Sequence, residues 1–229
     1  MMRLRQLVGR VLKGDPLRRG QLTYGHNGED LVLNHIFEGQ RTGFFVDVGA
    51  HHPMIYSNTY LLYRRGWRGI NIDAEPGSMR AFNRWRPRDI NVEAAIGTKA
   101  QALTYFRFNA PALNTFDPDE AKLKDTGQHH IVERIQIPMR RLAEVLAEHM
   151  PAGQSIDFMT IDVEGFEIEV LESGDWERFR PRYVLAEILR TPILELGEHR
   201  IVKWLQGAGY RPVTQAFNTT FFEDTRTAA

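Results

Sequence analysis

The stretch Gly43-Phe44-Phe45-Val46-Asp47-Val48-Gly49-Ala50-His51-His52-Pro53 decides the fold, because a short apolar run stops there at an acid, a glycine and two histidines. Apolar runs of this length are typical of buried strands. In an open α/β sheet, ligands bind beyond the carboxyl ends of the strands. We therefore predict that residues 43–53 form the first strand of an α/β sheet and the turn that carries polar groups into a ligand site.

The composition narrows the classes of protein that this chain can be. Its 229 residues suffice for one well-buried domain. Basic and acidic residues balance at 29 each, so we expect no nucleic-acid partner. The absence of cysteine excludes disulfides, thiolate metal sites and cysteine nucleophiles. No run approaches the roughly 18 apolar residues of a membrane span, and no signal peptide precedes the domain, which predicts a cytoplasmic protein.

Residues 1–20 differ from the rest of the chain. Apolar residues recur there at helical spacing between basic ones (Leu4, Leu7, Val8, Val11 and Leu12). We predict a basic amphipathic helix over residues 1–20, a catalytic domain over residues 21–222 and a disordered tail over residues 223–229. The helix has two interpretations: peripheral contact with the inner face of a membrane, or packing on its own domain or on the partner in a homodimer.

Strands and helices alternate through most of the domain. Further strands are expected at residues 70–73, 90–96, 156–163 and 183–188. Helices are expected at residues 23–37, 57–65 and 198–208. One more helix should end at residue 85, and two others should lie around residues 142–146 and after residue 165. Residues 209–213 and 219–222 should form a closing antiparallel pair. An insertion at about 101–138 has strands at 102–108 and 131–137 around an irregular segment, 111–127, and is expected to be a lid. This pattern predicts a doubly wound, mostly parallel sheet with helices on both faces.

Acidic residues end three of the predicted core strands. Asp47, Asp73 and Asp162 should converge on one crevice at the carboxyl edge of the sheet. A carboxylate after the second strand suits the paired hydroxyls of a ribose, for which Asp73 is the first candidate and Glu75 its rival. Gly49 lets the backbone of the first turn approach a ligand closely.

Several nucleotide motifs are missing. His51, His52 and Pro53 stand where a G-x-G-x-x-G turn has its remaining positions, so a dinucleotide is disfavoured. There is also no P-loop and no G-x-S-x-G elbow. A nucleoside without a pyrophosphate suggests S-adenosylmethionine. An NAD-dependent sugar oxidoreductase or epimerase, which lacks its Tyr-x-x-x-Lys pair here, and a non-catalytic binding module remain as alternatives.

Four runs, in this order and spacing, resemble the FkbM family of methyltransferases. They are Phe45-Val46-Asp47-Val48-Gly49-Ala50, Ser57-Asn58-Thr59, Ile72-Asp73-Ala74-Glu75-Pro76 and Asp157-Phe158-Met159-Thr160-Ile161-Asp162-Val163-Glu164-Gly165. The resemblance implies a class I, Rossmann-like O-methyltransferase with a seven-stranded sheet. It also implies S-adenosylmethionine as cofactor and a hydroxyl of a sugar as acceptor, in surface polysaccharide or glycolipid biosynthesis. The partner would then be a sugar, glycolipid or polysaccharide.

The resemblance also implies where the cofactor lies. Asp47 and Gly49 would line its methionine end, Asp73 would hold the ribose, and residues 91–97 would border the adenine. The full set of expected cofactor residues is Asp47, Gly49, Ala50, Ser57, Asn58, Asp73, Glu75, Ala95 and Asp162. One departure stands before the lid helix, where Gly25-His26-Asn27 replaces the usual Ser-Gln, so no cofactor contact is carried over to His26.

Methyl transfer to a sugar hydroxyl needs an aligned acceptor, and a base or a metal ion at its oxygen. The expected catalytic residues are Asp162, His51, His52 and Glu187, and the expected ligands of Mg²⁺ are Asp162 and Glu164. Each has an alternative structural role. Asp162 would cap the next helix or orient the cofactor's ammonium group, the histidines would cap and pack, and Glu187 would contact backbone amides.

Overall fold

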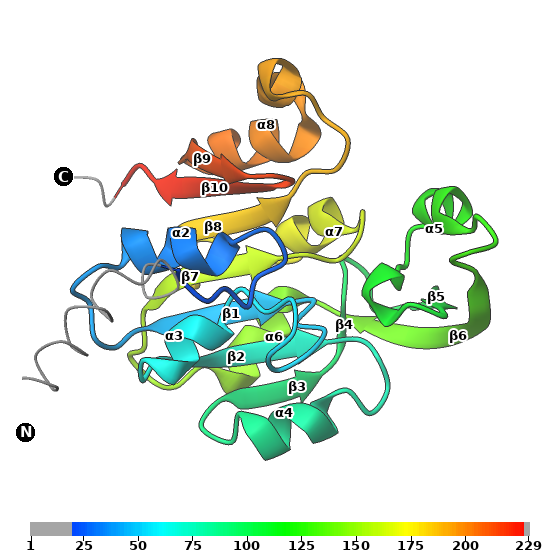
Figure 1. Cartoon of the computed structure of the whole chain (residues 1–229), viewed down its shortest axis with the longest axis horizontal. Coiled ribbons are helices and arrows are strands. Elements are labelled where there is room, and N and C mark those ends of the chain that lie inside the picture. Colours follow the sequence, from blue (N-terminus) through cyan, green and yellow to red (C-terminus); the bar gives the residue numbers. More distant parts are fainter. Residues whose placement is uncertain (1–19, 227–229) are drawn as a thin grey trace, which may run out of the picture.

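The computed structural model describes residues 20–226 and centres on a seven-stranded sheet (Figure 1). Its order is β3-β2-β1-β7-β8-β10-β9. The strands are β1 (Phe44–Val48), β2 (Arg68–Asp73), β3 (Ile90–Glu93), β7 (Ile156–Ile161), β8 (Pro181–Glu187), β9 (Tyr210–Ala216) and β10 (Thr219–Asp224). Strands β3 to β8 in this order pair in parallel, and β10 runs antiparallel to both neighbours. The predicted doubly wound sheet with an antiparallel final pair is confirmed.

Strand β1 lies at the middle of the sheet, and all five of its residues are buried. Phe45 packs with Leu33 and Trp67 on one face, while Val46 packs with Leu146 on the other. Both faces are thus covered, which explains why the strand is apolar throughout. The order of the chain reverses between β1 and β7, so the topological switch point lies at the carboxyl ends of these two strands.

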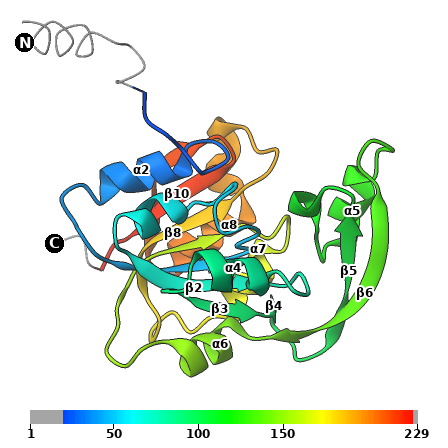
Figure 2. The same cartoon turned by 60° about the horizontal axis from the view of Figure 1, so that its bottom comes forward.

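Helices cover the sheet on both faces (Figures 1 and 2). One face carries α2 (Glu29–Ile36), α3 (Tyr60–Arg64) and α4 (Met79–Trp85). The other carries α6 (Leu142–His149), α7 (Glu167–Glu172) and α8 (Arg200–Gly207), which follows η3 (Ile193–Glu198). Within residues 20–226, no helix is long and apolar enough to cross a bilayer.

The insertion stands out from the body as a separate arm (Figure 2). Its strands β5 (Ala102–Phe108) and β6 (Ile131–Arg140) pair antiparallel, and β4 (Ala95–Ile96) joins them. Between the long strands lie η2 (Pro111–Leu113) and α5 (Pro118–Lys124). The predicted strands of the insertion are present, and their hairpin carries the intervening segment toward the carboxyl edge of the central sheet.

The predicted third strand, residues 90–96, is wrong in its extent. The main sheet keeps only β3, because the Ala94 amide bonds to the Asp73 carbonyl oxygen and the chain then leaves to pair Ala95 with Met139. The irregular segment predicted at 111–127 is also wrong in part. Asp117 caps α5 by accepting the amides of Asp119 and Glu120, an Asp-Pro start that the sequence displays.

Two predicted boundaries also shift. Helix α2 begins at Glu29 rather than at residue 23, because Gly28 is left-handed (φ 84°) and Asp30 accepts the Tyr24 amide. Strand β10 continues to Asp224, where Arg180 forms an ion pair, so the predicted domain limit at residue 222 lies too early. The predicted amphipathic helix over residues 1–20, apart from its last residue, and residues 227–229 of the predicted tail lie outside the described residues.

Candidate active site

A cavity of about 460 Å³ lies at the carboxyl ends of β1, β2, β7 and β8, beneath the insertion. The turns after these strands supply most of its wall, and residues 111–116 of the insertion close one side. The sequence-predicted residues that line it are Gly49, His51, His52, Asn58, Asp73, Glu75, Asp162, Glu164 and Glu187. The convergence of Asp73 and Asp162 on one crevice is therefore confirmed.

Four other predicted residues are not among those that line the cavity: Asp47, Ala50, Ser57 and Ala95. Asp47 accepts a hydrogen bond from Thr59 (2.8 Å), and burial raises its pKa to about 6 against the opposing charge of Arg86. Ala95 packs among the apolar side chains of the insertion. In this structure these four residues lie outside the lining of the cavity, and their direct contact with a cofactor stays a prediction.

The turn after β1 needs glycine at position 49. Gly49 has φ 84°, and a Cβ there would overlap the carbonyl oxygen of Asp162. Its amide and that of Ala50 both donate to the Ile72 carbonyl oxygen, at 3.0 and 3.1 Å. This close crossing of the β1 and β7 turns holds Asp162 at the switch point, so any side chain at position 49 displaces the acid.

The two acids at the carboxyl end of β2, Asp73 and Glu75, have different hydrogen-bond partners. Asp73 accepts the amides of His51 and Glu75, each at 2.8 Å, and so ties the first turn to the second. Glu75 is held by the insertion, where Arg107 lies 2.6 Å and Asn114 3.1 Å from its carboxylate. Asp73 is buried, whereas Glu75 is accessible from the cavity. Both acids line the cavity, but Asp73 also forms the turn, and Glu75 is the more exposed of the two.

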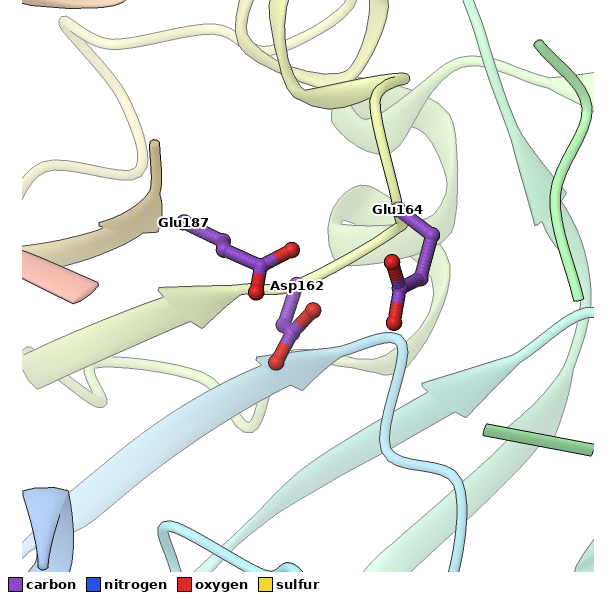
Figure 3. A group of neighbouring side chains, drawn as sticks. All are labelled: Asp162, Glu164 and Glu187. Atoms are coloured by element: carbon purple, nitrogen blue, oxygen red, sulfur yellow. The ribbon is translucent and has the colours of Figure 1, made fainter. Parts of the chain in front are cut away.

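Asp162, Glu164 and Glu187 form an acid cluster, with one carboxylate oxygen of each lying within 4.8 Å of the others (Figure 3). Burial is the main cause that raises the pKa of Asp162 and Glu187, and the negative charges of the cluster raise both further. The two side chains hydrogen-bond to each other. The surroundings of the Asp162–Glu187 pair therefore favour the neutral form of these carboxyl groups.

The insertion is bound directly to this acid cluster. Lys124 of α5 forms an ion pair with Glu164 (2.5 Å), and the Thr115 hydroxyl donates to the Glu164 carbonyl oxygen (2.9 Å). Arg190, which follows β8, pairs with Glu120 of α5. These contacts hold the insertion over the cavity and exclude water from one side of the cluster.

The two histidines have different surroundings. The Nδ1 atom of His52 accepts the amides of Met54 and Ile55, each at 3.0 Å, so the ring caps the turn before α3. Burial lowers the pKa of His52 and favours the neutral ring that this acceptor role requires. Burial also lowers the pKa of His51, with the negative charge of Glu164 opposing it. His51 thus lies next to the acid cluster, whereas His52 has the structural role weighed from the sequence.

Two residues of the cavity wall were missed as site residues. Glu29, at the start of α2, is almost fully buried, lines the cavity and accepts the Asn27 amide (2.8 Å). His26 lines the cavity just before it. The Gly28-Glu29-Asp30 run marks a helix start, where acids are common, so it gives no signal of a site by itself. Only the packing of α2 on β10 brings Glu29 into the wall.

The buried Glu167 of α7 predicts that the free energy of unfolding depends on pH. Burial raises the pKa of Glu167 to about 7, above its unfolded value of 4.5. A folded pKa above the unfolded one gives stability that is complete below pH 4.5 and is lost as the pH rises through about 7. Glu167→Gln removes this loss, on the order of 3 kcal/mol at most. Urea denaturation at pH 5 and pH 8 should show the variant gaining relative to wild type at pH 8, and an equal difference at both pH values contradicts the account.

The strand order, with β10 antiparallel near one edge, and the glycine turn beside an acidic crevice define a class I methyltransferase fold. Residues 47–212 match the model of the Methyltransferase FkbM domain, and the chain belongs to this family. Membership of a methyltransferase family implies S-adenosylmethionine as the cofactor. The cavity fits this group, because its volume, its glycine turn and its carboxylates suit a cationic nucleoside.

One further protein is similar in sequence to part of this chain, and one solved structure is similar in fold over most of it. Methyltransferase sdnD of Sordaria araneosa is 31% identical in an alignment of 114 residues, with a coverage of 42% of this chain and 41% of that protein. The match thus spans less than half the length of that relative. Among solved structures, the METTL16 methyltransferase domain is similar over 92% of this chain and 71% of its own, with 12% identity and a TM-score of 0.43.

Proposed function

We propose that the protein is an S-adenosylmethionine-dependent O-methyltransferase that acts on a hydroxyl of a sugar, in surface polysaccharide or glycolipid biosynthesis. The charge of the cavity carries the choice of cofactor. Six carboxylates line it (Glu29, Asp73, Glu75, Asp162, Glu164 and Glu187), and no lysine or arginine of the described chain does. S-adenosylmethionine bears a sulfonium and an ammonium against one carboxylate, whereas NAD bears a pyrophosphate. The cavity therefore favours the first and disfavours the alternative oxidoreductase.

Glu75 is the acid that we propose for the ribose hydroxyls. Its carboxylate is the more exposed of the two and is positioned by Arg107 and Asn114 of the insertion, whereas Asp73 is buried and fixes the backbone through two amides. Asp73 then acts by fixing the turns on either side of the ribose. The sequence favoured Asp73 for the ribose and Glu75 as its alternative, and this assignment reverses that order. The contacts of Glu75 with Arg107 and Asn114 of the insertion support it.

Glu75→Gln tests this assignment. Losing a charged acceptor of two hydroxyls should weaken S-adenosylhomocysteine binding by roughly 10- to 100-fold, because charge-assisted hydrogen bonds contribute about 1.5–3 kcal/mol. The thermal midpoint of the free protein should change little, since Glu75 is partly exposed. Asp73→Asn is the matched variant and should lower the midpoint, because an amide NH₂ then faces a backbone N–H. Calorimetry and melting curves separate the two, and unaltered binding in Glu75→Gln contradicts the assignment.

The acid cluster provides the base that the acceptor needs. When bound, S-adenosylmethionine supplies an electrophilic methyl group. Asp162 and Glu187 lie at the ends of β7 and β8, where they receive the proton of the acceptor hydroxyl as the carbon–oxygen bond forms. Their raised pKa values make their ionised forms stronger bases than free carboxylates. Glu164, held by Lys124, completes the side that faces the insertion.

Mg²⁺ is a second candidate occupant of the acid cluster. Three carboxylates offer the oxygen ligands that Mg²⁺ prefers, and a bound cation also activates a hydroxyl. Transfer measured with EDTA distinguishes the two. Full activity with EDTA supports proton transfer to the acid cluster without a metal ion. Activity that is lost with EDTA and restored by Mg²⁺ supports a metal ion bound to the acid cluster.

The proposed function is tested by transfer of labelled methyl from S-adenosylmethionine to a panel of sugars and glycolipids. We expect label in an alkali-stable ether on a sugar, together with equimolar S-adenosylhomocysteine. Label in an alkali-labile ester, or on no sugar, contradicts the proposal.

The proposal also places the enzyme in the cytoplasm, where its cofactor is made. Residues 1–20 would contact the inner face of the membrane or a partner in a homodimer, and they have no role with nucleic acid. Sedimentation of the full chain with anionic vesicles should exceed that of a chain that lacks residues 1–20. Equal sedimentation favours the packing interpretation instead.

A further inference from the structure

Three aromatic rings meet at the wall of the cavity. The Tyr56 ring lies 4.6 Å from the His26 ring, measured between centroids, and 6.2 Å from the His51 ring, to which it is nearly parallel at 16°. All three residues line the cavity. We call His26, His51 and Tyr56 the aromatic shelf.

The turn after β1 holds two rings of the aromatic shelf in unusual backbone conformations. His51 has φ 53° and Tyr56 φ 55°, the left-handed region that side chains other than glycine rarely adopt. Asp73 fixes the first through the His51 amide, and His52 fixes the segment before the second through the Ile55 amide. Tyr56 is 51% exposed, so packing against the protein does not offset the strain of its backbone conformation. Both strained residues line the cavity, and strained backbone of this kind clusters at ligand and active sites.

The position of the aromatic shelf favours the acceptor over the cofactor. His51 and the acid cluster line the same cavity, and His51 follows β1 while Asp162 and Glu164 follow the neighbouring strand β7. Asp73 and Glu75, where the nucleoside is expected, lie at the end of β2 on one side of β1, whereas His26 precedes α2, whose Glu29 contacts Thr219 of β10 on the other side. A flat ligand on the aromatic shelf therefore presents its edge to the proposed base.

The aromatic faces and the charge of the cavity define the ligand. Aromatic rings stack on the apolar C–H face of a sugar ring. Arg107 and Lys124 pair with Glu75 and Glu164, and no lysine or arginine of residues 20–226 lines the wall to offset the other acids, so the cavity disfavours an anionic sugar. Resting on the proposed function, we propose that the aromatic shelf is the acceptor subsite and takes an uncharged or amine-bearing sugar ring, with any carrier phosphate outside the cavity.

Saturation-transfer NMR on the full chain saturated with S-adenosylhomocysteine tests this subsite. The probes are methyl glucopyranoside, the matching glucuronate and the matching 2-amino sugar. We expect transfer to the neutral and amine-bearing probes and none to the glucuronate. Tyr56→Ala should reduce the affinity for the neutral probe by about fivefold or more, and Tyr56→Phe should retain it. Trp85→Ala is the control, because Trp85 is 52% exposed and does not line the cavity.

Calorimetry with S-adenosylhomocysteine accompanies every variant. Unchanged affinity in Tyr56→Ala supports an acceptor role, whereas a parallel loss assigns the aromatic shelf to the cofactor and overturns the proposal. Transfer to the glucuronate, or to none of the three probes, also overturns it. If the wild type binds neither adenosyl ligand, the proposed function itself fails, so the two failures are distinct.

Discussion

Asp162→Asn is expected to lower kcat for methyl transfer by about 10²- to 10⁴-fold, the range for loss of a positioned base. The variant keeps the shape of the side chain, and its amide can still bond to Glu187. S-adenosylhomocysteine binding should therefore be retained. The proton of the acceptor hydroxyl then has no acceptor at the end of β7, and binding without turnover is the result.

The same strand supplies a matched control for this prediction. Asp157 lies at the opposite end of β7, where it accepts the Phe44 amide at 2.8 Å. Asp157→Asn should keep its kcat, at a small cost in stability. If Asp162→Asn instead loses S-adenosylhomocysteine binding, the acid orients the cofactor, and its assignment as the base is wrong.

Arg86→Met is expected to cause the largest loss of stability. Its guanidinium is fully buried, bonds to Asp89 and Thr59, each at 2.8 Å, and lies over the Phe45 ring. Removing it leaves the buried carboxylates of Asp47 and Asp89 without their cation. Breaking one partner of a buried pair costs about 3–5 kcal/mol of the free energy of unfolding.

Urea denaturation with a matched variant checks this value. Arg88→Met removes an exposed guanidinium that donates to the Tyr63 carbonyl oxygen, so it should cost below about 1 kcal/mol. Burial raises the pKa of Asp47 and Asp89, and the charge of Arg86 opposes it, so the loss in Arg86→Met should shrink at low pH, where both acids take up protons. Equal losses in the two variants contradict the buried network.

The sequence predicted the parts of this protein that depend on local pattern. The apolar runs at Phe44–Val48 and Ile156–Ile161 are strands because both faces of the sheet are covered, and acids after such runs must meet at one edge. The limits of β5 were predicted residue for residue, since its alternation marks a half-exposed strand.

The remaining features depend on contacts between distant residues. Ala95 and Ile96 follow β3 after a single residue, and only their pairing with Met139 and Arg140 assigns them to the insertion. Glu29 enters the cavity through the packing of α2, which no local pattern shows. The separate roles of the acids after β2 likewise arise from a turn geometry that the sequence does not display.

The central claim is that a cavity lined by carboxylates, without lysine or arginine in the described chain, binds a cationic nucleoside cofactor. Calorimetric titration of the full chain with S-adenosylmethionine, S-adenosylhomocysteine and NAD tests it most directly. We predict saturable binding of both adenosyl ligands and no heat with NAD. Binding of NAD without either adenosyl ligand would contradict the account.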